Sequence, residues 1–426
     1  MSITNSLYIG ISGLIAHGEA ISVVGDNIAN TSTIGFKRAR ASFSDVLGGE
    51  LGAQRLGGGV RLGGTQTMFE EGSINTTGNP LDVAVSGSGM FIVKGRSNGH
   101  DGQFYTRDGR FKLDNQGFVV DNRGLRLQGF TIGATGTRAT TAGDLPLGAR
   151  QSPAVATTKA SMNLNLDANT VPNATGFDPA NPNTTSDYAT STTVFDSLGA
   201  KHTVEVYFRA QGAGSWEWHA MVDGGEVGGT PGTLQEIGTG TLGFDTNGRL
   251  DTQANGATNV SFTNATPGQL VTFDFGDDIA SGGTGLKGST QSAGASSVNS
   301  VNVDGRGFGN LEQLKIDDDG TIEGVFDNGD RHDLAQIALA TFASNEGLER
   351  GGDGLFNETA ASGQALVDAP GNGGRGSLIA GALEGSNVDL GTELVTLIAF
   401  QRAFQANAKT VTTADEMLQE ISNLKR

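Results

Sequence analysis

The stretch DNIANTSTIGFKR, residues 26–38, ends one sequence pattern and begins another. Upstream of it, apolar or small residues recur alternately at every fourth and third position, a spacing typical of a helix buried along one seam. Within it, Asn30 suits the left-handed conformation that ends many helices, and Gly35 permits a further turn. Thr31 and Thr33 favour extended chain. We therefore predict a helix that stops at Asn30 and an extended linker after it.

The predicted N-terminal helix needs packing partners. Each of the glycines inside it, such as Gly10 and Gly13, costs about 1 kcal/mol relative to alanine in a helix interior. The small residues also let neighbouring backbones approach closely, which favours a crowded core made from several chains. The large apolar residues of the predicted seam are Leu7, Ile11, Leu14, Ile21 and Ile28.

The C-terminal stretch repeats the same rhythm and predicts a second long helix. Ser386 and Asn387 are N-cap residues, and Asp389 places a negative charge in the first turn, where the helix dipole favours it. Lys425 and Arg426 supply the complementary charge at the other end. Because chain termini commonly lie close together, we expect the two helices to pair, with the rest of the chain inserted between them. The apolar residues of this seam are Leu390, Leu394, Leu397, Phe404, Val411 and Leu418.

Composition indicates that the middle of the chain is mostly β. Glycine accounts for 67 of the 426 residues, and many glycines lie in turn sequences such as LDNQG, DNRG and DTNG. We therefore predict an α+β, mostly β protein: paired N- and C-terminal long helices form a coiled-coil-like core, and β domains are nested between them. The formal charge of −18 disfavours nucleic acid as a partner, and the absence of cysteine excludes disulfides and thiol chemistry.

The sequence predicts neither a membrane span nor a cleaved signal peptide. No uninterrupted apolar run approaches the roughly 18 residues of a membrane helix. Residues 7–16, LYIGISGLIA, have the length of a signal-peptide core, but the preceding MSITNS carries no Lys or Arg.

Several segments carry a family resemblance. VVGDNIANTSTIGFKRAR (23–40) and the stretch from Glu384 to the C-terminus resemble the two terminal signatures of the bacterial flagellar rod and hook axial proteins. Residues 71–95, 104–130, 347–364 and 374–387 resemble segments of that family in the family's order. One departure is Ile34, where the family commonly has proline. The signature residues are Asn27, Ala29, Asn30, Gly35, Phe36, Lys37, Ser386, Asn387, Asp389, Gln401, Arg402, Gln405 and Asn407.

The middle of the chain resembles the hook branch of this family, through STTVFDSLGAKHTVEVYFRAQGAGSWEWHAMVDGG (191–225). The resemblance implies a structural subunit of the flagellar hook, which polymerises into a flexible, curved tube and transmits torque from rod to filament. It also implies export through the flagellar type III apparatus without a cleaved leader. The implied partners are other copies of the chain, the rod and hook-filament junction proteins, the hook cap and the export apparatus. No membrane insertion, cofactor, metal or catalytic residue is implied.

The same reasoning predicts nested domains. A helical core would comprise 1–30 and 385–426, and an extended linker region 31–70 and 355–384. An inner β domain would comprise 71–147 and 287–354, and an outer β domain 148–286. Gly- and Ser-rich stretches at both ends of the outer segment are typical of domain junctions.

Short chemical motifs have plainer explanations. Gly238 to Gly243 satisfies G-x-G-x-x-G, and Gly95 to Gly99 satisfies G-x-S-x-G, but both lead into strand-like sequence instead of the helix that each motif requires. Asp317 to Gly320 lacks the ligand spacing of a calcium loop and predicts a turn.

Three other functions remain as alternatives to a hook subunit: a distal rod protein of the same family, a secreted β-rich adhesin and an enzyme. The polar residues Gln401, Arg402, Gln405 and Asn407 could form a solvated helix face, bind a neighbouring subunit or face an export channel.

Overall fold

The computed structural model describes residues 3–51, 54–97, 99–133, 136–148, 151–256 and 258–424. The chain divides into two compact units. The helix-bearing unit comprises Met1–Arg150, Glu312–Val325 and Arg331–Arg426, and the sandwich unit comprises Gln151–Leu311 and Phe326–Asp330. The predicted fold class is confirmed: the protein is mostly β, with its long terminal helices in contact and the β sheets inserted between them.

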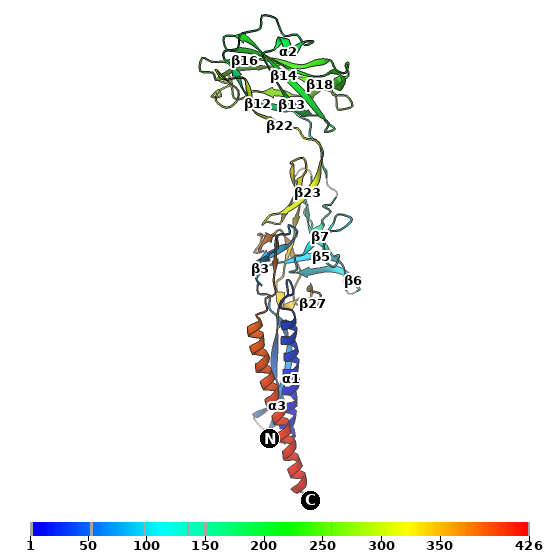
Figure 1. Cartoon of the computed structure of the whole chain (residues 1–426). Coiled ribbons are helices and arrows are strands. Elements are labelled where there is room, and N and C mark those ends of the chain that lie inside the picture. The colour runs from blue at the N-terminus through cyan, green and yellow to red at the C-terminus, as the bar shows by residue number, and fades with distance from the viewer. Residues whose placement is uncertain are drawn as a thin grey trace. The chain divides into compact units, whose positions relative to one another are not determined.

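Two antiparallel helices, α1 (Ile3–Ala29) and α3 (Leu390–Leu424), lie side by side in the helix-bearing unit (Figure 1). The segment expected to be an extended linker after α1 folds back on itself. It forms a long antiparallel hairpin of β1 (Ala39–Leu51) and β2 (Gln54–Thr67), interrupted by bulges, and β2 packs along α1. The two helices and the hairpin therefore form one three-part structure.

The remaining strands of the helix-bearing unit form a main antiparallel sheet with the order β23-β24-β25-β9-β5-β6-β28-β27, its side strands, and the two separate pairs β3-β31 and β4-β30. Met90, Tyr105 and Phe356 belong to its core. These strands are β3 (Ile74–Thr76), β4 (Val83–Ser86), β5 (Met90–Ser97), β6 (His100–Thr106), β7 (Phe111–Leu113), β8 (Val119–Asp121), β9 (Arg126–Thr131), β10 (Gly143–Asp144), β23 (Gly309–Ile316), β24 (Thr321–Phe326), β25 (Arg331–Ile337), β26 (Leu339–Thr341), β27 (Glu349–Gly352), β28 (Leu355–Asn357), β29 (Leu366–Asp368), β30 (Ser377–Ala380) and β31 (Ala382–Glu384), with the 3-10 turn η2 (Asn345–Gly347).

In the sandwich unit, a five-stranded sheet β13-β14-β15-β16-β17 shares one core with a four-stranded sheet built around β12. Alternate residues of each strand enter the core, and Trp216 and Trp218 are buried there, as their spacing predicts. The elements are β11 (Gln151–Ser152), β12 (Lys159–Asp167), α2 (Pro182–Thr185), β13 (Tyr188–Phe195), β14 (Lys201–Gly212), β15 (Ser215–Asp223), η1 (Gly224–Val227), β16 (Leu234–Phe244), β17 (Leu250–Asn255), β18 (Asn259–Val260), β19 (Gln269–Leu270), β20 (Thr272–Asp274), β21 (Thr290–Ser292) and β22 (Ser297–Val303).

The sandwich unit extends further along the chain than the expected outer segment 148–286. β21 and β22 both pair with β12 and complete its sheet, so the compact unit continues to Leu311. The Gly- and Ser-rich stretch that suggested a boundary near residue 286 connects strands within this unit.

The helix ends differ in detail from the sequence prediction. Asn30 is absent from the residues with positive φ; its side-chain amide instead donates to the Asp26 carbonyl (2.9 Å) and so satisfies the helix end itself. Gly35 does adopt the left-handed conformation, with φ 67°.

At the start of α3 the capping residue is Asp389, whose carboxylate accepts from the Thr392 amide (2.6 Å), in place of Ser386 or Asn387. This bond holds the pKa of Asp389 below its usual value. Lys425 and Arg426 lie outside the described residues.

Candidate assembly interface

Close packing between α1 and α3 depends on small residues. A Cβ atom on Gly13 would lie 2.6 Å from the Asn407 side chain, and one on Gly10 would lie 2.8 Å from Val411. Ala16 and Ala20 continue the same stripe of α1 and are fully buried. The two backbones therefore approach closely where α1 has almost no side-chain volume.

The β1-β2 hairpin packs against the α1 side of the helix pair. The Ser12 hydroxyl accepts from the Val60 amide (3.1 Å), and a Cβ on Gly59 would clash with that hydroxyl. The rings of His17, Phe43 and Phe400 then join the hairpin to both helices, with centroids 5.2 to 5.9 Å apart.

Large apolar side chains point away from this packed seam. On α1, Tyr8 and Ile15 are 68% and 59% exposed. On α3, Val395 and Ile398 are 69% and 49% exposed. Exposed apolar area of this extent on paired helices is typical of a protein–protein contact.

Part of the predicted seam lies in the close contact between the helices: Val411 faces Gly10, and Phe404 lies near Gly18. The 4-3 rhythm selects the largest apolar residues, whereas the α1 side of this contact is made by glycine and alanine. Ile11, Leu390, Leu394 and Phe404 are exposed. The partly buried members are Leu7, Leu14, Ile21, Ile28, Leu397, Val411 and Leu418.

The polar residues of the N-terminal signature build a junction between the helices and the β strands. Asn27 is 1% exposed, and its side-chain amide both accepts from the Ala39 amide (2.9 Å) and donates to the Ala39 carbonyl (2.8 Å). It also donates to the Glu393 carboxylate on α3 (3.2 Å). A single side chain thus joins α1, the hairpin and α3.

A buried ionic cluster, Lys37, Glu384 and Arg107, continues the junction into the β strands. The Lys37 ammonium contacts one Glu384 oxygen at 2.5 Å, and the Arg107 guanidinium contacts the other at 3.0 Å. The Gly72 amide donates a further bond to the carboxylate (3.0 Å). Burial lowers the pKa of Lys37, while the charge of Glu384 acts in the opposite direction.

The remaining signature residues complete this junction. Asn387 accepts from the Arg38 amide (2.7 Å) and donates to the Met68 carbonyl (2.8 Å). The Ser386 hydroxyl accepts from the Val388 amide (3.3 Å), and Ala29 is the exposed last residue of α1.

Arg350, which the sequence analysis did not single out, also belongs to the junction. Its guanidinium lies over the Phe36 ring (4.9 Å), donates to the Lys37 carbonyl and pairs with Asp26 (3.4 Å). Glu384 and Arg107 were likewise missed. The sequence feature that could have identified Glu384 is a single carboxylate next to the apolar residues of β31.

The four polar residues of α3 separate into two groups. Asn407 is partly buried against Gly13, and its amide donates to the Ala403 carbonyl (2.9 Å). Gln401, Arg402 and Gln405 are exposed and remain available to a neighbouring molecule.

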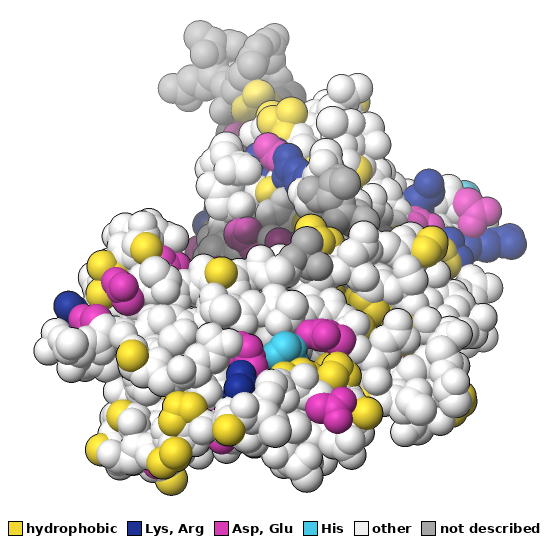
Figure 2. Space-filling view, turned by 90° about the horizontal axis from the view of Figure 1, so that it is seen from above, with side chains coloured by type: hydrophobic (Ala, Val, Ile, Leu, Met, Phe, Trp, Pro, Cys, Tyr) yellow, Lys and Arg dark blue, Asp and Glu magenta, His cyan; other side chains and the backbone are white. Residues whose placement is uncertain are grey.

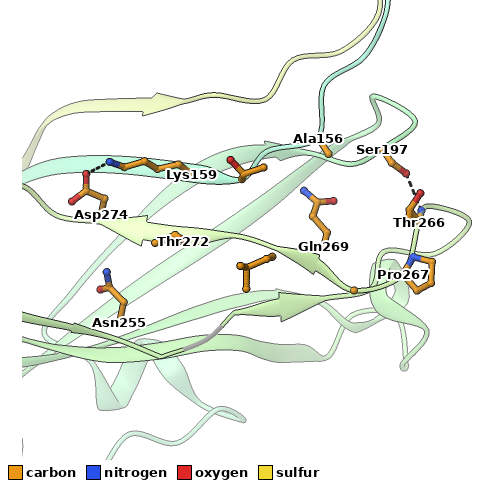
Figure 3. A pocket seen from close by; sticks show the side chains of 12 residues that line it. Ala156, Lys159, Ser197, Asn255, Thr266, Pro267, Gln269, Thr272 and Asp274 are labelled. Carbon is orange, nitrogen blue, oxygen red and sulfur yellow. Dashed lines mark hydrogen bonds and ion pairs between the residues drawn. The ribbon is translucent and has the colours of Figure 1, made fainter.

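The sandwich unit contains a groove of about 810 Å³. Figure 3 shows that its polar side chains bind one another: Lys159 pairs with Asp274 (2.8 Å), and Ser197 accepts from the Thr266 amide (2.8 Å). On the face seen in Figure 2, charged and hydrophobic side chains are scattered among uncharged ones. The described residues contain no group of three or more His, Asp or Glu side chains placed to hold a metal.

The short chemical motifs have the structural roles that the sequence predicts. Gly238 to Gly243 lie within β16, and Asp317 to Gly320 form the turn between β23 and β24.

Helix α1 is the one described helix that is long and apolar enough to span a membrane by length and composition, with a mean hydropathy of 1.5 over its most apolar window. The core helix of a soluble protein passes the same test. Gly, Ser, His17 and Glu19 interrupt its apolar residues, so α1 contains no long unbroken apolar run.

We predict that Asp196→Asn destabilises the sandwich unit more at pH 7 than in acid, where protonation of the Asp196 carboxylate removes the same charge. The Asp196 carboxylate is 2% exposed and accepts from the amides of Leu198 (2.8 Å) and Ala200 (2.9 Å). Burial alone would raise its pKa, but these bonds and the contact with His202 lower it below 3.8. The contribution of the Asp196 carboxylate to the free energy of unfolding is therefore complete above pH 4 and is lost as pH falls through the lowered pKa.

Tryptophan fluorescence during urea unfolding measures this effect in the full chain, because both tryptophans lie in the sandwich unit. At pH 7 we expect the substitution to lower the free energy of unfolding by about 1–3 kcal/mol. An equal difference between variant and parent at pH 7 and pH 2 would contradict the prediction.

Four family profiles match segments of the chain from its N-terminal to its C-terminal part. The profile described as "Flagella basal body rod protein" matches residues 7–37, and "Flagellar hook protein FlgE/F/G D1 domain" matches 84–171. "Flagellar basal body protein FlaE D2 domain" matches 163–306, and "Flagellar basal body rod FlgEFG protein C-terminal" matches 379–424. The N- and C-terminal profiles thus include nearly all of α1 and all of α3.

Relatives that match this chain over nearly its full length are described as flagellar hook proteins. The flagellar hook protein FlgE of Escherichia coli (strain K12) is 36% identical over 427 residues, covering 97% of this chain and 98% of that protein. The flagellar hook protein FlgE of Treponema pallidum (strain Nichols) is 33% identical over 470 residues, covering 99% of each chain. The crystal structure of Helicobacter pylori flagellar hook protein FlgE2 covers 71% of this chain and 98% of that chain, with 13% identity and a TM-score of 0.46.

Proposed function

The chain belongs to the flagellar hook protein FlgE family of structural, non-enzymatic hook subunits, and on this premise we propose how it performs mechanical work. Hook proteins self-polymerise within the extracellular flagellum. In our proposal, the tube made by this chain is curved and flexible and transmits torque from the rod to the filament.

The observation that carries the proposal is the combination of an exposed apolar surface and a buried junction in one unit. The helix pair exposes large apolar side chains, such as Tyr8 and Val395, that a neighbouring subunit would cover. Head-to-tail contacts of this kind do not close and therefore generate a filament. The Lys37, Glu384 and Arg107 cluster holds the same helices to the β strands, so a force applied to one is passed to the other.

Individual residues have distinct roles in this proposal. The predicted seam residues that are exposed or partly buried in one chain, among them Ile11, Leu394 and Phe404, form the contacts between subunits. The signature residues Asn27, Lys37 and Asn387 instead form the junction within a subunit. Exposed Gln401, Arg402 and Gln405 contact either a neighbour or the lumen of the tube.

The proposal also includes a route of assembly. The chain is exported without a cleaved leader through the type III apparatus and is added beneath a cap. The assembled tube joins the rod at one end and the hook-filament junction proteins at the other. Family membership and the full-length similarity to hook proteins support these partners.

Electron microscopy of purified protein under polymerising conditions tests the proposal. We expect curved tubes. Straight, rigid tubes would favour a distal rod protein, and a protein that remains monomeric at all concentrations would contradict polymerisation.

We predict that a chain lacking 151–311 still polymerises. The helix pair and its junction lie entirely in the helix-bearing unit, and a short flexible linker can replace an inserted unit at small entropic cost. Contacts between sandwich units of neighbouring subunits would be lost, so the tubes should be straight or differently curved.

Micrographs of this deletion variant decide the outcome, and circular dichroism of its helices provides the folding control. Absence of tubes from a folded variant would place the sandwich unit in the assembly core. Tubes of unchanged curvature would show that curvature arises in the helix-bearing unit.

A further inference from the structure

The outward apolar side chains of the helix pair include two groups, here called patches, besides Phe404, Met417 and Ile421 further along α3. The first, on α1, consists of Tyr8, Ile11 and Ile15, which are 68%, 37% and 59% exposed. Their spacing of three and four residues places them on one helix face. The second patch, on α3, consists of Leu390, Leu394, Val395 and Ile398, which are 48%, 43%, 69% and 49% exposed.

The two patches lie at different levels along the helix pair. Within one chain, Gly13 faces Asn407 and Asn27 contacts Glu393, so residues at the same level have numbers that add to about 420. Ile11 is therefore level with the region of Lys409, and Val395 is level with the region of Gly25. The patches are offset by about 14 residues, or roughly 20 Å at 1.5 Å per residue.

Each patch is free of charged side chains, whereas the other helix of the same chain carries exposed charges at or near the level of that patch. The first patch lies in a part of α1, Thr4 to Gly18, that contains no Asp, Glu, Lys or Arg. From Leu394 to Gln401, α3 has none. At the level of the first patch, α3 instead exposes Lys409, and at the level of the second patch α1 exposes Asp26, with Glu19 one turn beyond the patch.

We propose that the α1 patch of one subunit packs against the α3 patch of a second copy that is shifted by roughly 20 Å along the helix axis. This contact rests on the proposed polymerisation. Because all subunits of a tube point the same way, α1 of one copy runs antiparallel to α3 of the next. In one such register Tyr8 meets Ile398, Ile11 meets Val395 and Ile15 meets Leu390.

Packing without this shift is unfavourable. It would place Ile11 of one copy against Lys409 of the next, and Val395 against the region of Glu19 and Asp26. Burying a charge against an apolar side chain removes its hydration without supplying a partner. The shift brings the uncharged apolar patches together and leaves Lys409, Glu19 and Asp26 in water.

Disulfide cross-linking tests this register, because the natural chain contains no cysteine. Tubes are assembled from an equal mixture of Ile11→Cys and Val395→Cys subunits, oxidised and analysed by denaturing gel electrophoresis. The matched control mixes Ser22→Cys with Val395→Cys, since Ser22 is exposed and lies near the level of Val395 within one chain. A disulfide requires Cα atoms within about 7 Å, so the offset excludes a bond between positions 11 and 395 of one chain.

We expect a covalent dimer from the Ile11→Cys and Val395→Cys mixture at least tenfold more abundant than from the control or from either variant alone. The second pair, Tyr8→Cys with Ile398→Cys, should give the same result if a substitution at Ile11 prevents assembly. A dimer from Ser22→Cys with Val395→Cys, or from Ile11→Cys alone, would overturn the register while leaving polymerisation intact. Failure of the unsubstituted chain to form tubes would overturn the proposed function itself.

Discussion

Replacing Glu384 with alanine should lower the free energy of unfolding of the helix-bearing unit by about 3–5 kcal/mol. Glu384 is fully buried, and its carboxylate is the shared partner of Lys37 and Arg107. Its removal leaves two buried cations without their counter-ion, which is the costly way to break a buried ion pair. Lys37 is 1% exposed, so water reaches its ammonium only after the junction opens.

Denaturant unfolding followed by far-UV circular dichroism measures this loss. Tryptophan fluorescence in the same samples is an internal control, because the tryptophans report on the sandwich unit and its midpoint should not change. The matched variant is Glu70→Ala, which removes the exposed partner of Arg38 and should cost less than about 1 kcal/mol. Equal effects of the two substitutions would mean that the buried cluster does not hold the junction together.

Ile15→Asp should abolish tube formation while leaving the subunit folded. Ile15 is 59% exposed in the single chain, so an aspartate there stays hydrated in the free subunit and should change its stability by less than about 0.5 kcal/mol. In a tube the same carboxylate would be buried among apolar side chains without a partner. A cost of about 3 kcal/mol or more per contact corresponds to at least a ~100-fold rise in the concentration needed for assembly.

Sedimentation of tubes over a range of protein concentrations measures this shift. Ser22→Asp is the control, because it adds the same charge to an exposed polar position of the same helix. If Ile15→Asp assembles at the parental concentration, the α1 patch is not part of the contact between subunits.

Apolar periodicity was sufficient to find both helices and to predict that they pair. It could not select the face by which they pair within one chain. Gly10, Gly13 and Ala16 make that contact, and small residues contribute little to a hydrophobic pattern even where they permit the closest packing. The strong 4-3 pattern of Ile11 and its neighbours instead marks side chains that the single chain leaves partly or wholly exposed.

The junction shows a second limit of sequence reasoning. The resemblance identified Asn27, Lys37 and Asn387 as signature residues, but their partners lie far away in the chain: Lys37 and Glu384 are separated by 347 positions. Local patterns contain no information about such pairs. The hairpin of β1 and β2 was missed for a related reason: residues 39–44 alternate between apolar and polar side chains, but the rest of β1 and the Gly-rich β2 lack the alternation that predicts a strand.

Amide hydrogen exchange in free subunits and in tubes tests most directly the claim that the helix pair builds the tube. The two patches have no cover in one chain, so α1 and α3 should exchange much faster in free subunits than in tubes. The sandwich unit has its own buried core, so its protection should change little on assembly. Equal protection of both helices before and after assembly, with new protection appearing in the sandwich unit alone, would contradict the claim.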